Sequence, residues 1–224
     1  MRVVIRIGGS VIASPPSPGL IQRYAEVIQS LRAEGNELAV VVGGGSPARE
    51  FIQLAKRAGL SEPEQDEAAI SVSRVFAQLL AMRMGGLDWK GVPTSIAEAT
   101  RILQERGIVV MGGLRPGMTT DTVAALIALE ANADLIVKAT DQDGVYAKDP
   151  RRYRDAEKLD RLTFDELGLL LEKGEHEVGI HQIVDPEAVR ILKERRIRTV
   201  IVNGFSPENL IAAMKGEEIG TSIT

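Results

Sequence analysis

Cysteine is absent from this sequence of 224 residues. The chain therefore has no disulfide, no thiolate nucleophile and no cysteine-bound metal, a composition that fits a reducing compartment. Histidine is almost absent as well, since the chain carries only His176 and His181. Neither stands beside a plausible nucleophile in the sequence, so we expect both to lie in solvent-exposed loop and neither to act in catalysis.

Long apolar runs and a basic excess are also missing. The apolar run at residues 3–7 is too short for the core of a signal peptide, and no later run is long enough to cross a bilayer. We therefore expect a soluble, cytoplasmic protein with no membrane partner. The formal net charge of −4 argues against a nucleic-acid partner. Two local basic clusters, at residues 151–154 and 193–198, are expected to be solvent-exposed faces.

Short β-branched segments alternate with longer amphipathic ones, which is typical of a parallel sheet flanked by helices. The predicted strands are residues 3–7, 38–42, 108–111, 135–137 and 199–202. The predicted helices are residues 20–31, 66–84, 121–131, 164–173, 185–195 and 207–215. Two further helices are predicted from their first residues, one with Ser46 as N-cap and Pro47 in its first turn, the other with a capping box of Ser95 and Glu98. No repeat interrupts this pattern, and a soft boundary falls at residues 131–134.

Glycine follows three of the predicted strands. Residues 8–10 read GGS, residues 43–45 read GGG and residues 112–113 read GG. Ligands of open α/β sheets bind at the carboxyl ends of the strands, and a missing Cβ lets backbone N–H groups approach phosphate oxygens. We therefore predict that these three glycine corners bind phosphate groups, although a structural role for any one of them stays open.

The common phosphate-binding signatures do not occur. There is no G-x-x-x-x-G-K-[ST] loop, and no G-x-G-x-x-G follows a strand. Four cations stand near the glycine corners in the sequence, namely Arg6, Arg49, Arg115 and Lys138. Arg49 comes four residues after Gly45, which places it one helical turn on and directs it back toward a bound phosphate; an exposed helix arginine is the alternative.

Five segments in this order resemble the amino acid kinase family and, within it, the archaeal-type uridylate kinases. They read GGS at residues 8–10, VVGGGSPAR at 41–49, MGGLRPGMTTD at 111–121, KATDQDGVYAKDP at 138–150 and VDP at 184–186. The resemblance covers nearly the whole chain, and its most specific part is D-G-V-Y-x-x-D-P. It implies a three-layer α/β/α sandwich with a mainly parallel sheet. Residues 1–224 would be a single domain, with an acceptor lobe at about residues 1–133 and a nucleotide lobe at about residues 134–224.

The same resemblance implies an activity, which is reversible transfer of a phosphoryl group from ATP to UMP in pyrimidine nucleotide biosynthesis. It also implies Mg²⁺ as a cofactor and a hexamer built as a trimer of dimers. No residue is assigned as a metal ligand, although the carboxylate of Asp121 could orient a cation or Mg²⁺. A phosphate acceptor is already an anion and needs no general base. Catalysis then consists of holding two polyanions in line and neutralising their charge.

Binding roles are carried over by the resemblance onto matching positions. The residues implied for ATP are Gly9, Ser10, Gly45, Arg49, Thr140, Asp141, Tyr146 and Asp149. The residues implied for UMP are Gly44, Asp66, Leu114, Arg115, Pro116, Gly117, Met118, Thr119 and Thr120, with Asp66 on the ribose hydroxyls. The residues implied for catalysis are Arg6, Arg49 and Asp121. Residues 119–121 also open a predicted helix, so capping and phosphate binding both remain possible for them. For Tyr146 a place in the core is the alternative to the adenine pocket.

Several positions depart from the family pattern. Arg6 stands where many relatives carry lysine, and it adds a planar fork to the same charge. Asp141 stands where asparagine is usual, which leaves the donor nucleotide open. Leu114, Arg115 and Met118 replace what are commonly threonine and histidine or glutamine, which leaves the acceptor open. Two alternatives follow: a kinase of the same fold for another small phosphate or carboxylate acceptor, and a non-catalytic binder of nucleotides or oxyanions.

Overall fold

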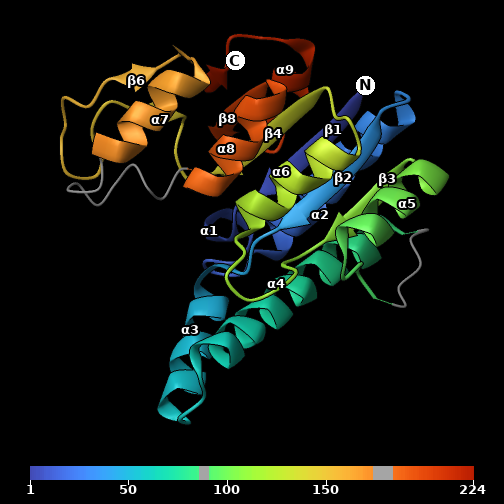
Figure 1. The fold of residues 1–224 in the computed structure, drawn as a ribbon. Helices are drawn as coiled ribbons and strands as arrows, with labels where there is room; N and C mark the ends of the chain where they lie inside the picture. Colours follow the sequence, from blue (N-terminus) through green and yellow to red (C-terminus); the bar gives the residue numbers. More distant parts are fainter. Residues whose placement is uncertain (86–90, 174–183) are drawn as a thin grey trace.

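The computed structural model describes residues 1–85, 91–173 and 184–224 (Figure 1). A seven-stranded sheet runs through the molecule in the order β3-β2-β1-β4-β8-β9-β7. Its strands are β1 (Arg2–Ile7), β2 (Glu37–Val42), β3 (Ile108–Met111), β4 (Leu135–Thr140), β8 (Thr199–Asn203), β9 (Thr221–Ile223) and β7 (Arg161–Leu162). The five strands from β3 to β8 are parallel, β9 runs antiparallel to β8, and β7 runs parallel to β9. The five strands predicted from β-branched runs are confirmed.

The sheet is covered on both faces (Figure 1). One face packs against α5 (Ile96–Arg106), α6 (Thr120–Glu130), α7 (Phe164–Lys173) and α8 (Pro186–Arg195). The other packs against α1 (Gly9–Ile12), α2 (Pro18–Ala33), α4 (Glu62–Met84) and α9 (Asn209–Lys215). Alternate residues of each strand enter the two apolar cores, because successive side chains point to opposite faces. The three-layer α/β/α sandwich is therefore confirmed.

A helical arm projects from one end of the sandwich. It consists of α3 (Gly45–Arg57) and the first half of α4, which lie side by side away from the sheet (Figure 1). A short two-stranded ribbon, β5 (Val145–Tyr146) and β6 (Lys158–Leu159), lies outside the main sheet. Within the described ranges, no helix is long and apolar enough to cross a membrane.

Some helix boundaries differ from those expected. Ser46 is not an N-cap, because α3 already begins at Gly45 with Gly44 in the cap position. The helix expected from residue 66 begins at Glu62, because Ser61 and Glu64 form a capping box there. Ser95 does accept from the Glu98 N–H at 3.2 Å. The Glu98 carboxylate, however, accepts from Thr94 N (3.0 Å), so that box is displaced by one residue.

The predicted boundary at residues 131–134 lies in the connection between α6 and β4. Strand β4 pairs directly with β1, and the register places Lys138 beside Arg6. The sheet is thus continuous across this point, and two cations from distant parts of the sequence meet near its carboxyl end.

Candidate active site

The first two glycine corners are in direct backbone contact. A Cβ on Gly9 would lie 2.1 Å from the backbone nitrogen of Gly45, and a Cβ on Gly45 would lie 2.3 Å from the carbonyl oxygen of Gly9. Gly45 also has a φ of +61°, in the left-handed region that glycine enters at little cost. Glycine is therefore required at both positions, and their contact joins the carboxyl ends of β1 and β2 into one floor.

The third corner has a different role. A Cβ on Gly112 would lie 2.7 Å from the backbone nitrogen of Arg74, and the Gly113 N–H donates to Ser73 Oγ at 2.8 Å. Both contacts are with α4, and neither glycine lines the cavity described next. For this pair the structure shows the structural role that the sequence had left open, because it packs against α4.

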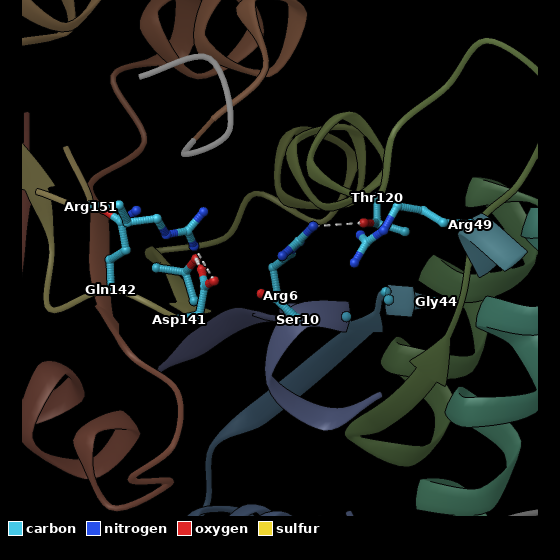
Figure 2. A pocket seen from close by; sticks show the side chains of 12 residues that line it. Arg6, Ser10, Gly44, Arg49, Thr120, Asp141, Gln142 and Arg151 are labelled. Atoms are coloured by element: carbon cyan, nitrogen blue, oxygen red, sulfur yellow. Dashed lines mark hydrogen bonds and ion pairs between the residues drawn. The ribbon is translucent and has the colours of Figure 1, made fainter. Parts of the chain in front are cut away.

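A cavity of about 580 Å³ opens above the two joined corners. Figure 2 shows Arg6 and Ser10 at its centre, Arg49 and Thr120 on one side, and Asp141 with Arg151 on the other. The predicted site residues that line it are Arg6, Gly9, Ser10, Gly44, Gly45, Arg49, Thr120, Thr140 and Asp141. The cavity is polar, and it lies at the carboxyl ends of parallel strands, where open α/β sheets bind their ligands.

Beneath the cavity, one carboxylate joins two cations. Asp121 Oδ1 lies 2.7 Å from Arg6 Nε, and Asp121 Oδ2 lies 2.5 Å from Lys138 Nζ. The N–H of Arg6 Nε does not point at Oδ1, so this contact is an ion pair rather than a hydrogen bond. Arg6 Nη2 donates to Thr120 Oγ1 at 3.0 Å, which fixes the other edge of the guanidinium. Asp121 thus faces the cations and not the cavity.

Two groups of this cluster, Asp121 and Lys138, have shifted pKa values. Burial alone would raise the pKa of the Asp121 carboxyl, but the charges of Arg6 and Lys138 overcome this and hold the pKa below its usual range. Burial lowers the pKa of Lys138 to about 8; Asp121 opposes the shift and Arg6 adds to it. Asp121 is therefore ionised at neutral pH, and Lys138 is the group of this cluster that titrates near physiological pH.

The sequence left two roles open for residues 119–121, helix capping and phosphate binding, and in the structure different residues are placed for each. Thr119 is the N-cap of α6, because its hydroxyl accepts from the Thr122 N–H at 3.1 Å. The hydroxyls of Thr119 and Thr122 both donate to the carboxylate of Asp185, which is the N-cap of α8. Thr122 Oγ1 lies 2.9 Å from Asp185 Oδ2. Thr120 instead lines the cavity. Capping thus falls to Thr119, and contact with the cavity falls to Thr120.

The titration of Lys138 predicts opposite effects of pH on two quantities, the turnover number and the stability of the fold. The turnover number is expected to fall as pH rises through about 8, because the cluster loses the positive charge of Lys138. The folded pKa lies below the unfolded value of 10.5, so between these pH values the unfolded chain binds more protons. For this residue alone, stability then rises with pH over the same window. Rate–pH profiles of the wild type and of Lys138→Met check this, since the variant should lack the step near pH 8.

The predicted acceptor loop lies beside the cavity. Pro116 and Gly117 occupy the centre of a turn closed by Met118 N to Arg115 O (3.2 Å), and Gly117 has the positive φ of +75° that such a turn needs. Asp66 Oδ2, on α4, accepts from the Gly117 N–H at 2.8 Å. Asp66 and the loop are therefore in contact, and the Asp66 carboxylate already holds the loop; their binding of UMP stays a prediction.

Other residues of this loop face away from the cavity. Leu114 and Met118 pack against the apolar core, and Arg115 is exposed. Neither Asp66 nor residues 114–119 are among those lining the cavity. In this structure most of the predicted acceptor residues form a neighbouring surface, and Gly44 and Thr120 are shared with the cavity.

On the donor side, Tyr146 and Asp149 do not line the cavity. Tyr146 is half-buried on the β5–β6 ribbon. Asp149 is buried, and its carboxylate accepts from the Arg151 N–H at 3.0 Å. Asp149 thus shapes the turn that carries Arg151, and its predicted reach to a ribose hydroxyl is not evident in this geometry.

Comparisons with known proteins agree with this arrangement. The family model that matches, over residues 1–203, is described as the amino acid kinase family. The chain belongs to the amino acid kinase family. Its relatives include proteins named uridylate kinase from Methanothermobacter thermautotrophicus and Methanocaldococcus jannaschii. Each is 41% identical and covers 100% of this chain and 99% of the relative. The crystal structure of uridylate kinase from Archaeoglobus fulgidus superposes with a TM-score of 0.90 at 38% identity and covers 100% of both chains.

Three residues at the site of this amino acid kinase were not predicted as site residues from the sequence. They are the cations Arg151 and Lys138 and the amide Gln142. Arg151 and Gln142 line the cavity, although the cluster containing Arg151 was expected to be a solvent-exposed face. Lys138 is buried behind Asp121. For Arg151 the only signal was its place directly after the D-P of the family motif.

Arg74 was missed for a related reason. Its Nε donates to Gly113 O at 3.0 Å and its Nη2 to Leu114 O at 2.9 Å, so it holds the start of the acceptor loop from α4. The sequence around an arginine in a helix does not show that its side chain will contact a loop 39 positions further along the chain. His176 and His181 lie outside the residues that the structure describes.

Proposed function

We propose that this chain is a uridylate kinase that transfers the terminal phosphoryl group of ATP to UMP and gives ADP and UDP. The observation that carries the proposal is full-length identity of about 40% to archaeal relatives of that name, together with a cation-lined cavity at the matching strand ends. The proposal includes a role in pyrimidine nucleotide biosynthesis and a location in the cytoplasm, which the absence of cysteine fits.

The residues of the cavity suit this reaction without a general base. The acceptor phosphate attacks as an anion, so the protein has to align two polyanions and neutralise charge on the transferred group. The joined corners at Gly9 and Gly45 present backbone close to the phosphates, while Arg6 and Arg49 approach from the centre and one side. The guanidinium of Arg6 is fixed by Asp121 and Thr120, so it needs no reorganisation during transfer.

Magnesium fits this site as an ion carried by the nucleotide. The described parts of the chain contain no cluster of three acidic or histidine side chains that could hold a metal. Asp121 is occupied by its two cations, and Asp141 is paired with Arg151. Mg²⁺ is typically held by phosphate oxygens and waters with few protein ligands, and it would neutralise charge on the donor phosphates. Thr140, Asp141 and Gln142 carry the side-chain oxygens of the donor wall that such an ion could contact.

A coupled assay of ADP release tests the proposal directly. ATP with UMP is expected to give turnover well above that with AMP, GMP, isopentenyl phosphate or acetylglutamate. Preference for one of the other acceptors would assign the chain to another kinase of this fold. Binding of ATP without turnover on any of them would make it a nucleotide binder.

Asp66 gives a prediction about the acceptor. Asp66→Asn keeps an oxygen that accepts from Gly117 but removes the carboxylate, so the KM for UMP should rise about tenfold while that for ATP stays within about twofold. The KM for dUMP should change less if the carboxylate contacts the 2′-hydroxyl. Glu62→Gln, an exposed acidic residue of the same helix, is the matched control. Unchanged UMP kinetics in Asp66→Asn would remove Asp66 from the acceptor site.

We also propose that the protein is a hexamer built from dimers. Support comes from α3 and α4, where five large apolar side chains are between 42% and 55% exposed: Phe51, Leu54, Val75, Leu79 and Met82. Their spacing of three or four residues puts those of each helix on one face, a pattern that a second copy would cover. Sedimentation velocity should give a species of six chains, and a monomer at micromolar concentration would contradict the proposal.

A further inference from the structure

Arg151 is the cation of the cavity that nothing in the sequence assigns to a function. Figure 2 shows it beside Asp141 and Gln142, on the side of the cavity opposite Arg49. We propose that Arg151 binds the phosphate chain of the donor nucleotide and that Asp141 positions its guanidinium for this contact. The inference rests on the proposed function in one respect, namely that the cavity holds a nucleoside triphosphate.

The backbone of Arg151 is fixed by a turn that begins at the buried Asp149. The Asp149 carboxylate, in a residue that is 9% exposed, accepts from the Arg151 N–H at 3.0 Å. The Asp149 carbonyl accepts from Arg152 N (3.0 Å) and Tyr153 N (2.9 Å). A side chain that starts from such a turn begins in a defined place. The proposed contact therefore does not require the loop to order itself first.

The side chain is held over the end of β4. Arg151 Nη2 lies 2.5 Å from Asp141 Oδ2, and Asp141 Oδ1 accepts from Thr140 Oγ1 at 3.2 Å. A guanidinium offers five N–H donors in a planar fork. It can therefore remain on the carboxylate with one edge while it donates to a phosphate oxygen, and charge-assisted contacts of this kind are the stronger hydrogen bonds.

The charges of the cavity give the second argument. Among the described residues that line it, Asp141 is the only carboxylate. Left alone, it would repel an incoming triphosphate. Arg151 neutralises it and adds a third cation to Arg6 and Arg49, on the wall that they do not reach. This also explains how an aspartate is accommodated at position 141.

The neighbouring arginines provide controls. Arg152 turns back to Asp149, with Nε 3.8 Å from Oδ2, and Arg154 is exposed; neither lines the cavity. Arg154→Ala therefore removes the same side chain from the same loop without touching the proposed contact.

NMR titrations of the protein with ATP, ADP and adenosine test the inference. In Arg151→Ala, affinity for ATP and ADP should fall at least about tenfold and that for adenosine less than about twofold, because adenosine lacks the phosphates. Arg151→Lys should recover part of the loss, and Arg154→Ala should match the wild type for all three ligands. In turnover, Arg151→Ala should raise the KM for ATP and leave that for UMP unchanged.

Two outcomes would overturn the inference. An equal loss for ATP, ADP and adenosine would make Arg151 a support for the loop, and wild-type affinities in Arg151→Ala would return it to a solvent-exposed face. Failure of the proposed function looks different. The wild type would then bind ATP but not phosphorylate UMP, and the binding series would still decide the role of Arg151.

Discussion

Arg6→Ala is expected to lower the turnover number for UMP-dependent ADP release by about 100-fold or more, the scale seen when one preorganised donor to a developing charge is removed. Arg6 lies at the centre of the cavity, and Asp121 and Thr120 hold both edges of its guanidinium. Its loss would leave the cavity floor without a cation and leave Asp121 with Lys138 alone. The KM for each substrate should change less than the turnover number, because the contact is expected to strengthen in the transition state.

Two controls accompany this variant. Arg6→Lys keeps the charge but loses the fork, so it should retain more activity than Arg6→Ala. Arg2→Ala removes an arginine from the other end of β1, where it pairs with Glu37, and should leave the turnover number unchanged. A turnover number of Arg6→Ala within about threefold of the wild type would remove Arg6 from catalysis.

Asp121→Asn is expected to lower the free energy of unfolding by about 3–5 kcal/mol, the usual cost of removing one partner from a buried ion pair. The side chain of Asp121 is 11% exposed and that of Lys138 is 5% exposed, so water would do little to screen the two remaining cations. Turnover should fall as well, by about tenfold or more, because Arg6 loses the carboxylate that fixes it. Urea unfolding measures the first effect, and the coupled assay measures the second.

A double variant separates charge from packing. Adding Lys138→Met to Asp121→Asn removes one of the two uncompensated cations, so most of the lost stability should return while turnover stays low. Asp155→Asn breaks an exposed pair with Lys148 and should leave both stability and turnover nearly unchanged. If Asp121→Asn proves as stable as the wild type, the buried ion pairs do not stabilise the fold.

The features that could be predicted are those encoded by residues close together in the sequence. The β-branched runs gave the five parallel strands. The glycines at positions 9 and 45 gave the cavity floor, because each follows a strand whose end lies at the ligand-binding edge. The short antiparallel β9 was not predicted, since three residues carry too little pattern to separate a strand from a loop.

The features that could not be predicted are contacts between distant residues. Thr122 and Asp185 are 63 positions apart, and Arg74 and Gly113 are 39 apart. The position of Asp121 in the sequence does not reveal its role. A carboxylate in the first turn of a helix is equally consistent with capping the helix and with binding a cation. Only its two ion pairs in the folded chain show that it lies between Arg6 and the buried Lys138. Arg151 is solvent-exposed, as expected for a basic cluster in a loop, but the turn at Asp149 also places it on the wall of the cavity, which the sequence did not indicate.

A crystal structure with a non-hydrolysable ATP analogue and UMP bound together is the most direct test of the whole account. The analogue's terminal phosphate should lie over the joined corners at Gly9 and Gly45, within hydrogen-bonding distance of Arg6, with the UMP phosphate in line beside Thr120. Both ligands bound away from this cavity, or phosphates facing α4 at Gly112 instead, would contradict it.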